Sequence, residues 1–194
     1  MQPAYRVATH AAAAVDGGDR RRPNVARVGR RQHGALVLAQ LVVEAEIDEY
    51  LAQASEWAPD ALAAALAALR PSATGKLAVL FGCGGDRDKG KRAEMGQIAS
   101  TGADQIFVTD DNPRTEDAAS IRASIISACP NAIEIASRDK AIAAALSSIG
   151  SGDVLLIAGK GHETVQLVGN ESLPFDDAAI ASHLMIQMQK RAVQ

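Results

Sequence analysis

The chain has 194 residues, a length typical of one domain or of one domain with an appendage. Hydrophobic residues make up 47% and aromatic residues only 3%, so a core of useful size must be built from Ala, Val, Ile and Leu. A net charge of -3 provides no basic surface for nucleic acid or a membrane, and no apolar run approaches the ~20 residues that span a bilayer. The two cysteines lack metal-ligand spacing, which argues against a metal site and favours a reducing, cytoplasmic setting.

The first 58 residues differ in composition from the rest. Residues 1–31 contain seven arginines and two acidic residues, and their apolar residues follow neither a helical nor a strand period. Residues 35–50 are first apolar and then acidic, which is compatible with a short helix or strand. We interpret residues 1–58 as an atypical segment that is either out of frame or disordered. An organellar transit peptide would also be rich in arginine, but the scarcity of serine and the acidic patch count against it.

From Pro59 onward, helical patterns alternate with apolar strands, and Pro59 itself opens the first helix. In chain order we expect a helix from residue 59 to about 70, a strand at 76–82, a helix at 91–100, a strand at 104–109, a helix at 117–128, a strand at 132–136, a helix at 139–149, a strand at 153–158, a hairpin around 169–170 and a final helix with inward Ile180, Leu184 and Met188. This alternation predicts an α/β fold, a parallel sheet with helices on both faces.

Three loops follow the predicted strands and contain the unusual residues of the chain: 82–92, 109–115 and 159–164. In open α/β sheets, ligands bind beyond the carboxyl ends of the strands, where these loops would lie. The first loop combines four glycines with four cationic residues near a helix start, which suits a phosphate or carboxylate. Its candidate phosphate or nucleotide contacts are Gly84, Gly85, Lys89 and Lys91. It is not a Walker A loop, and a basic flexible turn without a ligand remains the alternative.

In the second loop, Pro113 restricts the backbone and can aim the guanidinium of Arg114 at a carboxylate. Asp110 and Asp111 beside it suit a ligand that also carries an ammonium group. A helix-capping turn in which an aspartate and the arginine pair with each other is the alternative.

The third loop places His162 and Glu163 after two glycines, in acid–base or ligand-orienting positions. The pair lacks the spacing of a metal site. Cys83, inside the first loop, has no neighbouring base in the sequence, so we expect a packed thiol rather than a nucleophile.

Taken together, FGCGGDRDKGKR at 81–92, TDDNPR at 109–114 and AGKGHE at 158–163 resemble the Mur ligases that attach the third residue of the peptidoglycan stem peptide. The order and separation of the motifs, and PFDD at 174–177, also resemble that family. The resemblance covers residues 59 to 194, about two-thirds of the chain, and three motifs in register are specific where any one alone would not be.

The resemblance implies a Rossmann-like, carboxy-terminal, amino-acid-binding domain of a three-domain ligase. Such enzymes use ATP and Mg²⁺ to convert the γ-carboxylate of UDP-MurNAc-L-Ala-D-Glu to an acyl phosphate, and the amine of the incoming amino acid then displaces phosphate. The positions that match those holding the incoming amino acid are Arg87, Asp111, Asn112, Arg114, Gly159 and Glu163. The DNPR form resembles the branch specific for meso-diaminopimelate, with Arg114 at its distal carboxylate and Glu163 at its distal ammonium.

The chain departs from the family pattern before Pro59. Residues 1–58 contain no phosphate loop of the GTNGKT type, and the histidine and aspartate that the family has near the nucleotide are missing. We therefore expect this chain to be inactive alone, with no catalytic residue assigned and no tightly bound ATP or Mg²⁺. The alternatives are a non-catalytic amino-acid-binding module of the same fold, or an unrelated doubly wound nucleotide-binding enzyme.

Overall fold

A computed structural model of the protein describes residues 26–32, 35–43, 59–150, 152–160 and 163–191. Its centre is a six-stranded sheet in the order β1-β2-β6-β3-β4-β5, parallel throughout except for the antiparallel pair β1 and β2. The strands are β1 (Ala26–Gln32), β2 (Ala35–Val43), β3 (Leu77–Phe81), β4 (Gln105–Val108), β5 (Ile133–Glu134) and β6 (Val154–Ile157). A separate hairpin is formed by β7 (Val165–Val168) and β8 (Glu171–Pro174).

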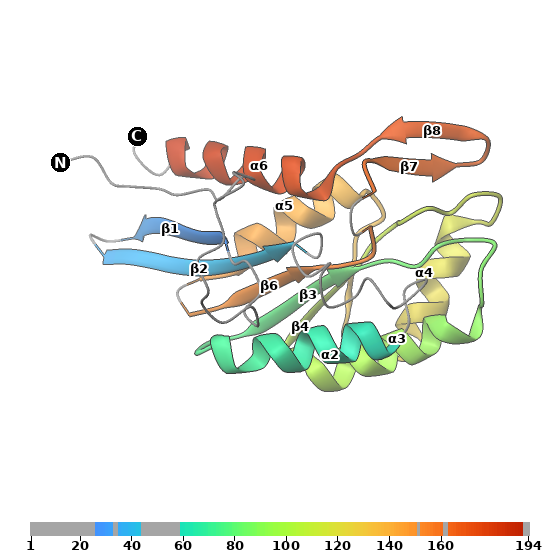
Figure 1. The fold of residues 1–194 in the computed structure, drawn as a ribbon, viewed down its shortest axis with the longest axis horizontal. Helices are drawn as coiled ribbons and strands as arrows, with labels where there is room; N and C mark the ends of the chain where they lie inside the picture. Colours follow the sequence, from blue (N-terminus) through green and yellow to red (C-terminus); the bar gives the residue numbers. More distant parts are fainter. Residues whose placement is uncertain (1–25, 33–34, 44–58, 151, 161–162, 192–194) are drawn as a thin grey trace, which may run out of the picture.

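Helices cover both faces of this sheet, which confirms the predicted architecture (Figure 1). One face carries α2 (Pro59–Leu69), α3 (Gly90–Gly102) and α4 (Ala118–Ile126), and a short 3-10 turn, η2 (Arg70–Ser72), follows α2. The other face carries α5 (Arg138–Ser148) and α6 (Asp177–Arg191). Every helix and strand predicted after residue 59 is present, with ends displaced by a few residues. None of the helices in the described part of the chain is long and apolar enough to cross a bilayer.

The two strands before residue 59 were not both expected. Strand β2 occupies part of the segment for which the sequence allowed a helix or a strand, whereas residues 44–50 lie outside the described residues. Strand β1 has no side-chain period that would predict it, but it pairs with β2 through main-chain groups, and such a ladder does not depend on alternating side chains. The proposed division of the chain at Pro59 stays a prediction.

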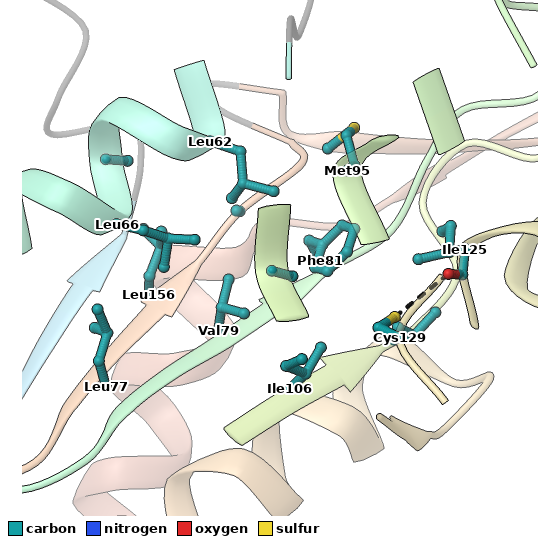
Figure 2. Close-up of a cluster of buried hydrophobic side chains, with 14 of the residues drawn as sticks. Leu62, Leu66, Leu77, Val79, Phe81, Met95, Ile106, Ile125, Cys129 and Leu156 are labelled. Atoms are coloured by element: carbon teal, nitrogen blue, oxygen red, sulfur yellow. Dashed lines mark hydrogen bonds between the residues drawn. The ribbon is translucent and has the colours of Figure 1, made fainter. Parts of the chain in front are cut away.

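The core is divided into two layers by the alternation of side chains along the central strands. Leu77, Val79 and Phe81 of β3 point toward the helices α2, α3 and α4, whereas Ala78 and Leu80 point toward α5 and α6. All five side chains are fully buried. Figure 2 shows the first layer, in which Cys129 lies at the edge of the cluster and donates from its Sγ to the carbonyl oxygen of Ile125 at 3.3 Å.

The sheet order decides where a ligand can bind. Strand β3 lies between β6 and β4, and all three run in the same direction. The loops that follow them therefore leave the sheet at one edge and lie next to one another, although they are separated by tens of residues in the sequence. These are the three loops that the sequence singled out.

Candidate functional site

A cavity of about 190 Å³ opens at this edge of the sheet, and residues from all three loops line it. The six residues that the sequence analysis matched to amino-acid binding are all in its lining: Arg87, Asp111, Asn112, Arg114, Gly159 and Glu163. Of the four candidate phosphate contacts, Gly84 and Lys91 also line it, whereas Gly85 and Lys89 are not part of the lining provided by the described residues. The structure thus brings together residues up to 81 positions apart, from Gly82 to Glu163.

Two hydrogen bonds at the backbone of Gly85 join the first loop to the second. The N–H of Gly85 donates to the carbonyl oxygen of Asn112 at 2.8 Å, and the Nη1 of Arg114 donates to the carbonyl oxygen of Gly85 at 2.8 Å. Because the N–H of Gly85 already donates to Asn112, it is not available to bind a phosphate. The contacts at Gly85 therefore hold the first loop against the second.

Arg114 adopts a positive φ of 52°, a backbone conformation that side-chain-bearing residues rarely adopt. The hairpin β7–β8 holds it there, because the N–H of Arg114 donates to Leu167 O at 3.1 Å and its carbonyl oxygen accepts from Gly169 N–H at 2.7 Å. The sequence predicted this hairpin from its turn residues but contained no sign that it would hold Arg114. The hairpin therefore sets the direction in which the guanidinium leaves the backbone.

Several polar groups that line the cavity or lie beside it are arranged around Asn112. Its Nδ2 donates to Oε2 of Glu163 at 2.6 Å, which links the second loop to the third. Asp111 is buried, and its Oδ1 makes no hydrogen bond with any described residue. Burial raises the pKa of Asp111, while the cationic side chains of Arg138 and Lys160 act in the opposite direction. The ammonium of Lys160 lies 3.6 Å from this Oδ1 as an ion-pair partner, so Asp111 contributes negative charge to the wall of the cavity.

Asp110 does not share this position. Its carboxylate pairs with the guanidinium of Arg122, which also binds Glu134 at 2.7 Å. We expected both aspartates beside Arg114 to face an ammonium group of the ligand. This is wrong for Asp110, because its carboxylate is paired with Arg122 of α4. The alternative prediction, in which an aspartate pairs with Arg114, is also wrong for Asp110, whose partner is Arg122.

Glu116 binds the cationic residues Arg92 and Lys89, which lie in the first loop. The buried guanidinium of Arg92 donates to both carboxylate oxygens of Glu116, at 3.1 and 2.8 Å, and the N–H of Asp86 donates to Oε1 at 2.6 Å. Lys89 lies 3.5 Å from the same carboxylate with most of its side chain exposed. The sequence did not identify Glu116, because its partner Arg92 is 24 residues away. Hydrogen bonds from Arg92 and from the Asp86 N–H lower the pKa of Glu116 to about 2.

This low pKa makes a testable contribution to the pH dependence of folding. Glu116 binds a proton more weakly in the folded chain than in the unfolded chain, where its ordinary value is 4.5, so its stabilising effect is complete above pH 4.5 and is lost as the pH falls toward 2. We expect Glu116→Gln to show a smaller loss of unfolding free energy between pH 5 and pH 3 than the wild type, measured by urea denaturation. Equal losses in the two proteins would contradict this assignment.

Cys83 also lines the cavity, with its Sγ 3.6 Å from the sulfur of Met95. Burial, followed by the nearby charge of Asp111, raises the pKa of Cys83 to about 12. The thiol therefore stays protonated at neutral pH, and its side chain packs against the first core layer, as predicted. His162 lies outside the described residues, and His183 is exposed on α6. Within the described ranges, no three His, Cys, Asp or Glu side chains gather as a metal site.

Comparison with known proteins gives concordant results. The sequence profile of the Mur ligase, glutamate ligase domain, matches residues 58–161. The chain is 56% identical over 131 residues to the UDP-N-acetylmuramoyl-L-alanyl-D-glutamate--2,6-diaminopimelate ligase of Bradyrhizobium diazoefficiens, and 52% identical over 133 residues to the enzyme of the same name from Brucella melitensis. These matches cover 65% and 68% of this chain, but only 27% of each relative. A solved structure of a ligase with this name matches the fold with a TM-score of 0.69 at 32% identity, covering 84% of this chain and 31% of the solved chain.

Proposed function

Because this chain belongs to the Mur ligase family through its glutamate ligase domain, we propose that it is the amino-acid-binding part of an ATP-dependent ligase. The proposed ligase adds meso-diaminopimelate to UDP-MurNAc-L-Ala-D-Glu in peptidoglycan synthesis. The relatives that carry this activity in their names match the chain at 52–56% identity, and the chain spans 27% of the length of the two described above. The activity of the whole enzyme is therefore part of the proposal.

The observation that carries the proposal is the convergence of both charge types in one cavity. Arg114 presents a guanidinium from the second loop, while Asp111 and Glu163 present carboxylates from the second and third loops. Diaminopimelate has an ammonium and a carboxylate at each end, whereas lysine lacks the distal carboxylate. We assign the distal carboxylate to Arg114 and the distal ammonium to Glu163, since a site built for a charged group rejects an analogue without it.

The described residues offer few contacts for a nucleotide. ATP and Mg²⁺ would supply the activation of the γ-carboxylate in the whole ligase. Among the described residues, no group of three His, Cys, Asp or Glu side chains could hold a Mg²⁺ ion on protein ligands alone. The N–H of Gly85 already donates to the second loop, and the mostly exposed Lys89 lies beside Glu116, away from the cavity lining. We therefore assign this chain to binding and orienting the amino acid, with Gly84 and Lys91 as the remaining candidates for a phosphate contact.

Calorimetric titration of the purified chain with meso-diaminopimelate and, separately, with lysine tests the proposal. We expect preference for diaminopimelate, and we expect Arg114→Ala to weaken diaminopimelate binding by about 10- to 100-fold because a charge-assisted hydrogen bond is lost. Lysine binding should change little. Arg70→Ala is the matched control, since Arg70 pairs with Asp104 before the amino ends of β3 and β4, at the opposite edge of the sheet. Equal affinity for the two amino acids would reject the assignment.

A ligation assay with ATP, Mg²⁺ and the nucleotide-linked dipeptide separates binding from turnover. We expect these 194 residues alone to bind the amino acid without forming product, as the match covers little more than a quarter of each relative. Detectable product would refute that expectation. A non-catalytic binding module would give the same result for the isolated chain, so the assay is repeated with the polypeptide that supplies the remaining regions of the ligase.

A further inference from the structure

Lys160 is a buried cation that does not line the cavity. It lies after β6 in the third loop, between Gly159 and residue 161, and its side chain is completely shielded from solvent. An isolated ammonium at such depth is costly, so its neighbours indicate what it is retained for. Burial lowers the pKa of Lys160, and the charge of Asp111 counteracts this shift.

The contacts of Lys160 converge on the second loop. Its Nζ donates to Oδ1 of Asn112 at 3.1 Å and to the carbonyl oxygen of Val165 at 2.7 Å. The same Nζ lies 3.6 Å from Oδ1 of Asp111 and 5.6 Å from the centre of the Phe175 ring. A lysine ammonium has three donors and no acceptor, so the side-chain atom of Asn112 that faces it must be the oxygen.

This contact and the N–H of Leu167 together fix which way the amide of Asn112 points. Its Oδ1 accepts from both Lys160 Nζ and the N–H of Leu167, the latter at 2.9 Å. The amide nitrogen is thereby directed to the other side, where Nδ2 donates to Oε2 of Glu163 at 2.6 Å. The chain of contacts runs from a buried cation, through an amide, to a carboxylate that lines the cavity.

We propose that Lys160 is a positioning residue for the amino-acid site: it orients the amide of Asn112, which in turn holds the carboxylate of Glu163 in place for a ligand ammonium. The ligand part of this inference rests on the proposed function. The orientation part does not, because it concerns contacts in the free protein. Lys160 itself touches no ligand, since it lies behind the wall formed by Asn112.

A ligand-free measurement tests the orientation. In ¹⁵N-labelled chain, the side-chain amide of Asn112, assigned through its loss in Asn112→Ser, is expected to exchange slowly and to differ in chemical shift from exposed asparagines. Lys160→Met should move these signals toward the exposed values. Lys140→Met is the matched control, because Lys140 is an exposed lysine on α5. Unchanged Asn112 signals in folded Lys160→Met would overturn the proposal.

A double-mutant cycle tests the functional part. We expect Lys160→Met to weaken meso-diaminopimelate binding about tenfold in the wild-type background, and less than about threefold when Glu163→Ala has already removed the carboxylate. Equal losses in both backgrounds would show that Lys160 supports only the fold, and would overturn the proposal. If Lys160→Met fails to fold, Lys160→Ala, which also removes the donor, is placed in the same cycle with the same criterion. If the wild type binds no diaminopimelate, the proposed function fails, while the amide signals still decide the role of Lys160.

Discussion

Replacing Arg138 with methionine is expected to lower the free energy of unfolding by about 3–5 kcal/mol. The guanidinium is fully buried, and its Nε and Nη2 donate to the two carboxylate oxygens of Asp177 at 2.8 and 2.6 Å. Nη2 also donates to the carbonyl oxygen of Ala158 at 2.8 Å. Arg138 begins α5 and Asp177 begins α6, so this one side chain ties both helices to the end of β6. Its removal would leave a buried carboxylate and a buried carbonyl without this partner.

Urea denaturation followed by circular dichroism measures the loss. The double variant Arg138→Met with Asp177→Leu should recover much of it, because a buried ion pair replaced as a whole by apolar groups is often neutral. Arg70→Met is the control, since the pair of Arg70 with Asp104 is 42% and 48% exposed and should contribute no more than about 1 kcal/mol. A loss below about 1 kcal/mol for Arg138→Met would contradict the importance given to the buried pair.

The role of Arg138 illustrates what the sequence alone could not predict. The helix after residue 138 was predicted from the spacing of Ile142, Leu146 and Ile149, which is a local pattern. The partner of Arg138 lies 39 residues further along the chain, and no periodicity links the two. The parallel sheet was predictable for the same reason that the helices were: each strand is a short apolar run whose type can be recognised from its own residues and neighbours.

The candidate site was predictable in its location but only partly in its internal contacts. Ligands lie beyond the carboxyl ends of parallel strands, and three motifs resembled a known family. Together these two observations predicted the six amino-acid contacts that line the cavity. Which polar groups would be used up within the protein depended on tertiary pairing. Asp110 is taken by Arg122, and the N–H of Gly85 is taken by Asn112. Lys160, in the third loop, was recognisable as a charge but not as a buried one.

Gly85→Ala is expected to disrupt the site and to weaken the binding of diaminopimelate. A Cβ built at Gly85 would lie 1.8 Å from the carbonyl oxygen and 2.7 Å from the carbonyl carbon of Pro113. Both obstacles are backbone atoms, so no side-chain rotation relieves the clash and the first two loops must separate. Arg114 would move with them, because its Nη1 donates to the carbonyl oxygen of Gly85. The expected loss of diaminopimelate affinity is of the same order as for Arg114→Ala, about 10- to 100-fold.

The same substitution should lower the free energy of unfolding by only about 1–3 kcal/mol, the usual range for overpacking, because the two core layers lie away from this loop contact. Gly90→Ala is the matched control in the same loop, since its Cβ would meet only the side-chain Oδ1 of Asp88, at 3.2 Å, and alanine is the better helix former at the start of α3. Calorimetry and urea denaturation on both variants separate the two effects. If Gly85→Ala bound diaminopimelate as the wild type does, the contact between the first two loops would not position Arg114, and the cavity would have to hold its ligand by other groups.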